Sequence, residues 1–275
     1  MPRASGRLAE GGRVIPERKR TIKPSPPYTR LAELYDRHWT GDFAREVFER
    51  VSTLLKGEGV KPGAMIDLAC GTGRLAMLFA AKGWTVTGVD ISKDMLAVAE
   101  QNARKAKGGR KITFVRGDMR RWSKAKAAEL VTCVYDSLNH LPSKSDLQKV
   151  FRNVYKTLKP GGIFLFDLND QAFYETYWNG RVDFAEGNDH SLVVRLTYSA
   201  KQSTGRVEST AFFRKGKVYE RVQEVVMQRM FTSSNVARML GTAGFVDINA
   251  RRFNPIPLPY QGTIKTFWSA KKDPA

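Results

Sequence analysis

A glycine-rich turn that begins with an acid is the first feature of this sequence that could bind a ligand. Residues 67–73 read Asp-Leu-Ala-Cys-Gly-Thr-Gly, between an apolar run and a helical pattern. Gly71 and Gly73 would let backbone N–H groups approach a ligand, and the segment also satisfies the unspecific dinucleotide pattern G-x-G-x-x-[GA]. The carboxylate of Asp67 would repel a pyrophosphate but would hold an ammonium group. We therefore expect a ligand that carries a cation near this turn.

Two further acids indicate that this ligand is a nucleoside. Asp90 ends the next apolar run, where an acid can accept both hydroxyls of an adenosine ribose. Asp118 follows a third run and could accept the adenine amino group. Ile91 and Met119 adjoin these acids and could enclose the adenine ring, with Gly117 beside them. The three acids together predict a site for a nucleoside with a cationic tail.

The segment 136–140, after the fourth apolar run, holds the candidate catalytic residues. His140 is the best candidate base, because the ordinary pKa of histidine is near neutral. The alternative is a histidine that lines the pocket without moving a proton. The other candidates for catalysis or substrate contact are Asn139, Asp136, Tyr174 and Tyr177. Both of these tyrosines are expected in surface loops.

These residues require a sheet that brings the ends of several strands together. Short apolar runs alternate with helical patterns from residue 64 onward. The predicted strands are 64–69, 85–89, 112–115, 130–135 and 163–166, and the predicted helices are 72–82, 93–105 and 144–158. Such alternation is typical of a doubly wound α/β fold, in which ligands bind beyond the carboxyl ends of the strands.

A different pattern follows residue 175. Three β-rich runs, 192–198, 207–213 and 218–230, are joined by segments suited to hairpin turns. Helix 234–242 and strands 245–248 and 263–269 then return to the main sheet, which would have seven mostly parallel strands in a Rossmann-like arrangement. We predict a disordered basic tail over 1–27, a helical cap over 28–60, a core over 61–170 and 232–275, and an antiparallel β insertion over 175–231 that roofs the substrate pocket.

The composition excludes several classes of protein. With 42% hydrophobic and 27% charged residues, the 275-residue chain can bury a large core. No apolar run is long enough for a membrane helix, and Cys70 and Cys133 form neither a disulfide framework nor a zinc pattern. We expect a cytoplasmic protein without a metal, in which both cysteines are small buried residues.

The net charge of +19 is the unusual property of the sequence. A strongly basic surface could indicate a nucleic-acid partner. Lysines and arginines are distributed over every predicted element, however, without a tight run interleaved with aromatic residues in the folded region. We therefore favour a generally basic surface, and a nucleic acid remains the alternative partner.

Five segments occur in an order that resembles the class I S-adenosylmethionine-dependent methyltransferases, over roughly residues 28–170. They are Asp67 to Gly73, Val89 to Ser92, Gly117 to Met119, Asp136 to Leu141 and Leu158 to Gly162. The resemblance implies S-adenosyl-L-methionine as the cofactor. It implies that the methionine moiety lies at Asp67 with Gly71 and Gly73, and that the ribose lies at Asp90. It also implies that the adenine lies at Asp118 and the transferred methyl group at Tyr135 with Asp136. Ala69 stands where many relatives have glycine.

Within this family, the chain is similar to small-molecule methyltransferases with a β insertion, of the glycine N-methyltransferase-like and methyltransferase domain 25-like type. In those enzymes an N-terminal helix closes over the cofactor, and Tyr28, Tyr35 and Trp39 fill that pattern; ordinary core aromatics are the alternative. The segment 136–139 lacks the Pro-Pro-aromatic motif of enzymes that methylate adenine or glutamine. We expect methyl transfer to an N or O atom of a small molecule, by a monomer or homodimer. The alternatives are an RNA or protein methyltransferase and a non-catalytic cofactor-binding scaffold.

Overall fold

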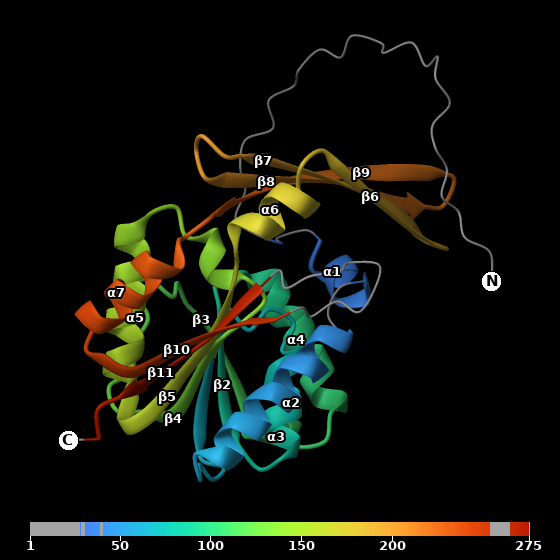
Figure 1. Cartoon of the computed structure of the whole chain (residues 1–275). Helices are drawn as coiled ribbons and strands as arrows, with labels where there is room; N and C mark the ends of the chain where they lie inside the picture. The colour runs from blue at the N-terminus through green and yellow to red at the C-terminus, as the bar shows by residue number, and fades with distance from the viewer. Residues whose placement is uncertain (1–27, 29–30, 39–40, 254–264, 275) are drawn as a thin grey trace.

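Seven strands form the main sheet of the protein (Figure 1). A computed structural model describes residues 28, 31–38, 41–253 and 265–274, so the predicted tail over 1–27 lies outside the described residues. The strands are β1 (Ala64–Leu68), β2 (Thr85–Asp90), β3 (Ile112–Arg116), β4 (Ala128–Cys133), β5 (Leu158–Asn169), β10 (Phe245–Phe253) and β11 (Lys265–Lys272). Their order across the sheet is β10-β11-β5-β4-β1-β2-β3. β1 to β5 pair in parallel and β11 is antiparallel to both of its neighbours, which confirms the predicted sheet.

The strand order places a binding crevice at the carboxyl end of β1. From β1 the chain proceeds to β2 and β3 on one side, and then returns to form β4 and β5 on the other side. Helices that leave neighbouring strands in opposite directions open a crevice at this position. Asp67 lies at the carboxyl end of β1 and Asp90 at the carboxyl end of β2, so two of the predicted site residues reach the same edge of the sheet.

Helices cover both faces of the sheet (Figure 1). α2 (Gly41–Gly57), α3 (Arg74–Ala81) and α4 (Lys93–Lys105) lie on one side, and α5 (Lys144–Thr157) and α7 (Ser233–Thr242) lie on the other. α4 and α5 begin where predicted, because the hydroxyls of Ser92 and Ser143 accept hydrogen bonds from N–H groups of their first turns. Among the described residues, no helix combines the length and the apolar character that a membrane crossing needs.

A second, antiparallel sheet lies over the carboxyl ends of the main strands (Figure 1). Its strands are β6 (Arg181–Gly187), β7 (His190–Ser199), β8 (Thr204–Lys215) and β9 (Val218–Arg229), in that order. The prediction of three strands was wrong by one. β6 escaped notice because it is an edge strand whose apolar residues Val182 and Phe184 are exposed, while Asp183 faces inward between them.

Two local predictions also need correction. The strand predicted at 163–166 begins earlier, at Leu158, and absorbs the expected Lys-Pro-Gly-Gly turn as an irregularity in its pairing with β4. Tyr174 and Tyr177 were expected in surface loops, but they lie in helix α6 (Gln171–Tyr177) and are buried. The ring of Tyr174 stacks on Tyr198 of the insertion, so these aromatic side chains join the second sheet to the end of β5.

Candidate active site

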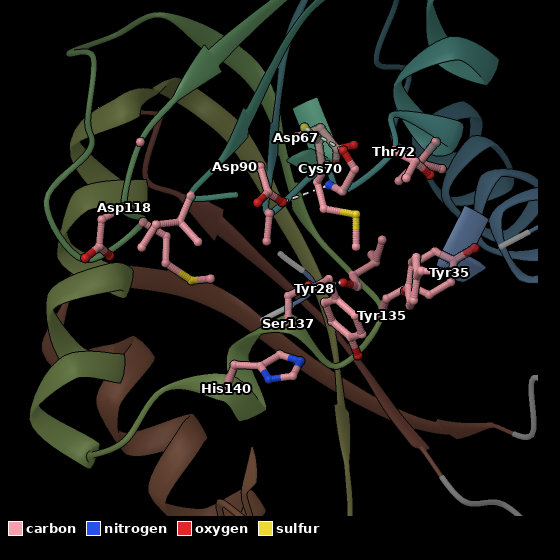
Figure 2. Close-up of a pocket in the computed structure, with 18 of the residues that line it drawn as sticks. Tyr28, Tyr35, Asp67, Cys70, Thr72, Asp90, Asp118, Tyr135, Ser137 and His140 are labelled. Carbon is pink, nitrogen blue, oxygen red and sulfur yellow. Dashed lines mark hydrogen bonds between the residues drawn. The ribbon is translucent and has the colours of Figure 1, made fainter. Parts of the chain in front are cut away.

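Two adjoining cavities lie at the carboxyl ends of the parallel strands. The first, of about 230 Å³, borders the glycine-rich turn and the ends of β1 and β2 (Figure 2). The second, of about 610 Å³, lies between the ends of β4 and β5 and the inner face of the insertion. Tyr28, Tyr35 and Tyr135 line both cavities. These three side chains therefore form the boundary between the two spaces.

The glycine-rich turn brings backbone to the wall of the first cavity. Gly71 has φ 55° and lines the cavity. Gly73 has φ 77°, and a β-carbon there would lie 3.0 Å from the ring of Phe114, so glycine relieves both backbone strain and crowding. Because Gly73 is left-handed, α3 begins only at Arg74 and not at the predicted residue 72. Ala69 also has φ 55°, so it carries strain of about 1 kcal/mol that a glycine would avoid.

Asp90 organises this turn and also faces the cavity. One carboxylate oxygen accepts a hydrogen bond from the N–H of Gly71 at 2.9 Å, and the other accepts from the N–H of Ser92 at 2.8 Å. The side chain lines the first cavity (Figure 2). A carboxylate has about four acceptor positions, so both oxygens retain capacity for the two hydroxyls of a ribose.

Asp67 is a buried carboxylate at the floor of the first cavity, 2% exposed. Its Oδ1 accepts a hydrogen bond from the Thr132 hydroxyl at 2.6 Å. Burial raises the pKa of Asp67 to about 7, and the nearby Asp90 adds to the increase. A cation bound here would reverse that effect, because an opposite charge stabilises the ionised form. The site is therefore suited to an ammonium group.

Asp118 marks the opposite end of the first cavity (Figure 2). Arg120 donates to both of its carboxylate oxygens, at 2.6 to 3.0 Å, which lowers the pKa of Asp118. Gly117, Ile91 and Met119 line the cavity beside it, and Ile91 is 43% exposed. The structure thus brings together the residues expected around an adenine ring, with Asp118 already held by a guanidinium group.

The N-terminal segment closes the first cavity from above. Tyr28 and Tyr35 pack with their ring centroids 4.6 Å apart, and both line the cavity. α1 (Ala32–His38) is held by Asp36, whose carboxylate accepts two hydrogen bonds from Arg74 at 2.5 and 2.8 Å. Trp39, the third residue expected in this lid, lies outside the described residues.

Asp136 lies where the second cavity meets the end of β4. Its Oδ1 accepts a hydrogen bond from the Lys265 ammonium at 2.5 Å, and its Oδ2 accepts one from the Gln228 side chain at 2.5 Å. Lys265 also donates to Asp167 at 2.9 Å. A buried lysine thus holds two carboxylates at the ends of adjacent strands, and the insertion contributes a further donor.

His140 lines the first cavity and has one buried nitrogen without a hydrogen-bond partner among the described residues. The ring is hydrogen-bonded to the Met227 carbonyl, and its Nε2 lies 3.4 Å from the Gln228 amide nitrogen. Its Nδ1 is buried with no hydrogen-bond partner among the described residues. Burial lowers the pKa of His140, so the ring is neutral near pH 7 and can accept a proton.

Asn139 does not reach either cavity, contrary to the prediction of a role in catalysis. Its Nδ2 donates to the Arg229 carbonyl at 2.8 Å, and its Oδ1 accepts from the Asn169 N–H at 3.0 Å. The side chain is fully buried and ties the insertion to β5. Cys133 is buried as expected, whereas Cys70 lines the first cavity.

Four further site residues escaped the sequence reasoning. They are Asp167, Glu224, Gln228 and Lys265. Asp167 had a usable signal, because it is an acid near the carboxyl end of an apolar strand. The other three lie in strands whose partners were not evident, and only the register of β9 and β11 brings them to the site.

The first cavity fits S-adenosylmethionine. The molecule combines a nucleoside with an ammonium-bearing chain, and the buried carboxylate of Asp67 could hold the ammonium. The carboxylate of Asp90 could accept ribose hydroxyls. The crowded position of Gly73 shows that the glycine-rich turn packs tightly against its neighbours.

Comparison with known proteins agrees with this geometry. Residues 65–162 match the family model described as methyltransferase domain. A Bacillus subtilis protein provisionally named methyltransferase YqeM is 32% identical over 185 residues, which cover 66% of this chain and 73% of that protein. The dTDP-3-amino-3,6-dideoxy-alpha-D-glucopyranose N,N-dimethyltransferase of Streptomyces fradiae is 30% identical over 66% of this chain and 70% of its own length.

Solved structures share the fold. An S-adenosylmethionine-dependent methyltransferase from Clostridium acetobutylicum superposes with a TM-score of 0.72 at 21% identity, covering 90% of this chain and 99% of its own. DesVI of Streptomyces venezuelae gives a TM-score of 0.70 at 20% identity, over 91% and 100% of the two chains. With this fold, the glycine-rich turn and these relatives, the chain belongs to the class I S-adenosylmethionine-dependent methyltransferases, and S-adenosylmethionine is its cofactor.

Proposed function

We propose that this enzyme methylates the nitrogen of a small-molecule amine, which it binds in the second cavity. The observation that carries the proposal is the junction of the two cavities. There the carboxylate of Asp136 lines the space under the insertion, and the ring of His140, whose Nδ1 is buried without a partner among the described residues, lines the cofactor cavity. An amine that binds as an ammonium needs an anion to hold it and a base to remove its proton, and the junction offers both.

The proposal assigns these roles to residues that line the two cavities and to the elements around them. Asp67, Asp90 and the turn at Gly71 and Gly73 hold the cofactor, and Asp118, Gly117, Ile91 and Met119 surround its adenine. Tyr28, Tyr35, Tyr135 and the turn residue Ala69 complete the enclosure. Trp39 is assigned to it by the family resemblance alone, because it lies outside the described residues. The insertion acts as the roof of the acceptor cavity, and the helical cap and the Rossmann-like core form the remaining units of the chain.

Methyl transfer requires few further groups from the protein. When bound, S-adenosylmethionine would supply the methyl group of its sulfonium to the amine lone pair, and its sulfur would leave as the neutral thioether of S-adenosylhomocysteine as the C–S bond breaks. His140 takes the proton from the ammonium, which frees that lone pair. Asp136 orients the nitrogen, and the tyrosines at the boundary exclude water. The product amine carries the new methyl group, and the imidazole of His140 carries the proton.

Relatives named for either acceptor atom match this chain, since ubiquinone biosynthesis O-methyltransferases are 34% identical over 42 to 44% of it; the choice of nitrogen rests on the junction of the cavities. The Streptomyces fradiae relative is named an N,N-dimethyltransferase, and another solved neighbour, KedS8, is described as a sugar N-methyltransferase. An RNA or protein acceptor is the second candidate, because the net charge is +19. The acceptor cavity is roofed by the insertion, and this favours a small molecule over a polymer.

The test is a radiolabelled methyl-transfer screen against pooled small amines, matched alcohols and total RNA. Label in amines alone is the expected result, and label in RNA alone would contradict the proposal. His140→Ala should reduce turnover by about 100-fold or more near neutral pH, the usual contribution of a general base. The loss should shrink at alkaline pH, where the free amine loses its proton in solution. His190→Gln is the control, since His190 lines neither cavity.

A further inference from the structure

Arg74 lines the cofactor cavity and also holds the helix that covers it. It is the first residue of α3, directly after the glycine-rich turn, and it belongs to the wall of the first cavity. Its Nε and Nη2 donate hydrogen bonds to the two carboxylate oxygens of Asp36 in α1, at 2.8 and 2.5 Å. Its Nη1 makes no hydrogen bond to the described residues, and the side chain is 41% exposed. A guanidinium has five N–H donors, so Arg74 retains donors for a ligand.

A second helix fixes the carboxylate that Arg74 binds. The side-chain amide of Asn102, in α4, donates to both oxygens of Asp36 at 3.3 Å and to the Thr72 carbonyl at 3.2 Å. The Asp36 side chain is only 11% exposed, so α1 is held between the helices that follow β1 and β2. Because two nitrogens of the planar guanidinium bind the two oxygens of Asp36, the orientation of the group is set before a ligand arrives.

The charges of Arg74 and Asp67 act on the same part of the cavity. Burial raises the pKa of the Tyr135 hydroxyl, the carboxylate of Asp67 adds to the increase, and the guanidinium of Arg74 opposes it. The Tyr135 side chain, which lines the first cavity, is therefore within electrostatic reach of both groups. Arg120, the other arginine of this cavity wall, is paired with Asp118 at the adenine end.

The methionine moiety of the cofactor carries two opposite charges on one carbon atom. Its ammonium suits the buried carboxylate of Asp67, and its carboxylate then needs a cation or N–H groups nearby. Arginine is well suited to a carboxylate, because its N–H groups form a rigid fork. Of the two arginines that line the first cavity, Arg74 is the one that shares its surroundings with Asp67.

We propose that Arg74 binds the carboxylate of S-adenosylmethionine through Nη1 while its Nε and Nη2 keep hold of Asp36. The cofactor and the lid helix α1 would then share one guanidinium. A bound carboxylate restricts this half-exposed side chain, and so it stabilises the helix that places Tyr35 over the cavity. The inference goes beyond the proposed function, because it concerns the cofactor and is independent of the acceptor.

Binding calorimetry with the full chain tests the first half of this inference. The ligands are S-adenosylhomocysteine and its decarboxylated analogue, in which hydrogen replaces the carboxylate. The unmodified protein should bind S-adenosylhomocysteine about tenfold or more tightly than the analogue, the usual effect of a hydrogen bond to a charged group. Arg74→Gln should lose most of this preference, and Arg74→Lys, which keeps the charge, should retain part of it.

Arg120→Gln is the matched control, because Arg120 lines the same cavity at the adenine end. This variant should keep the full preference for the ligand with the carboxylate, and circular dichroism verifies the fold of each variant. A full preference in folded Arg74→Gln would overturn the inference and assign the carboxylate to backbone N–H groups of the glycine-rich turn. The absence of any preference in the unmodified protein would overturn it as well.

Hydrogen exchange of the α1 amides tests the link to the lid. At saturating concentrations, S-adenosylhomocysteine should slow the exchange of α1 more than the decarboxylated analogue does. Asp36→Asn should lose this difference, because the lid no longer presents a carboxylate to Arg74. Equal protection of α1 by the two ligands in the unmodified protein would overturn the shared guanidinium. Neither measurement contains an acceptor, so a failure of the methyl-transfer screen would leave both results standing.

Discussion

At the scale of single residues, the site contains buried carboxylates whose ionised form is unfavourable while no cation is bound. Asp67 is the clearest example, because burial and the adjacent Asp90 raise its pKa to about 7. The unliganded protein binds this proton more tightly than the unfolded chain does, whose ordinary value is 3.8. The stability of the unliganded protein should therefore fall as the pH rises from about 4 to about 7.

Cofactor affinity should show the opposite trend. Only ionised Asp67 holds an ammonium, so binding releases a proton below the pKa of about 7. The affinity for S-adenosylmethionine should rise by up to about tenfold per pH unit between about pH 5.5 and 7, and then level off. Calorimetry in two buffers measures both the affinity and the released proton. Asp67→Asn should bind weakly and with little pH dependence; an equal slope in this variant would assign the proton to another group.

Gln228 is the residue that joins the roof to the catalytic face. Its Oε1 accepts hydrogen bonds from Tyr174 at 2.8 Å and Asn169 at 3.2 Å, which turns its amide nitrogen toward Asp136 and His140. Gln228→Leu should leave these buried groups unpaired and misplace Asp136. The activation free energy of methyl transfer should rise by about 1 to 3 kcal/mol, which corresponds to turnover roughly ten- to hundredfold lower.

The cofactor provides the internal control for this variant. S-adenosylhomocysteine affinity should change little in Gln228→Leu, because Gln228 does not line the first cavity. Gln223→Leu is a matched variant on the same strand, since the Gln223 side chain donates a hydrogen bond to the Thr210 hydroxyl of β8, at 3.0 Å, and lines neither cavity among the described residues. Equal losses of turnover in both variants would indicate a general effect on the insertion and not a role in positioning Asp136.

At the scale of elements, the insertion and the parallel sheet belong to separate apolar clusters. The sheet and its helices have their own apolar cores, built from β1 to β5 with α2, α3, α5 and α7. The insertion packs instead on α1 and the residue before it, because Leu31 and Leu34 share one buried apolar cluster with Leu192 and Val222. α1 is also tied to the core, through the bonds from Arg74 to Asp36.

Replacement of residues 181–229 by a short Gly/Ser linker should therefore abolish methyl transfer and preserve cofactor binding within about tenfold. The variant loses the roof of the acceptor cavity, and α1 keeps its ion pair with Arg74 but loses its apolar partners. Calorimetry with S-adenosylhomocysteine and the methyl-transfer assay check the two parts. A folded variant that no longer binds the cofactor would show that the insertion belongs to the cofactor site.

At the scale of the whole molecule, one group of exposed lysines lies away from the acceptor cavity. The segments that lead into β2, β3 and β4 carry exposed lysines, among them Lys82, Lys105, Lys107, Lys111 and Lys126. These segments lie at the amino ends of parallel strands, opposite the edge where the cavities open. These lysines are therefore poorly placed to select an acceptor.

Deletion of residues 1–24 should leave turnover of an amine substrate within about twofold, although it removes several of the basic residues. A rise in salt from about 50 to 200 mM should also have little effect. A polymer with several phosphate contacts would instead lose about 10³ to 10⁵ in affinity over this range. RNA methylation that weakens with both the truncation and the added salt would favour the nucleic-acid alternative.

The sequence by itself determined the features that depend on local pattern. Alternating apolar runs and helical periods specified the parallel sheet, because the backbone geometry of each element imposes its own period. The acid and glycines at 67–73 predicted a nucleoside site, because that turn follows directly from a strand and opens a helix. The same reasoning predicted Asp90 and Asp118, each from its position at the end of an apolar run.

Only the tertiary structure decided which distant residues meet at the acceptor side. Lys265 reaches Asp136 and Asp167 across 129 and 98 positions of the chain, and Gln228 reaches Asp136 across 92. Such pairs depend on which strands become neighbours and in what register, and no local period encodes that choice. The same holds for Tyr174, a residue of a short helix that is buried only because the insertion folds over it.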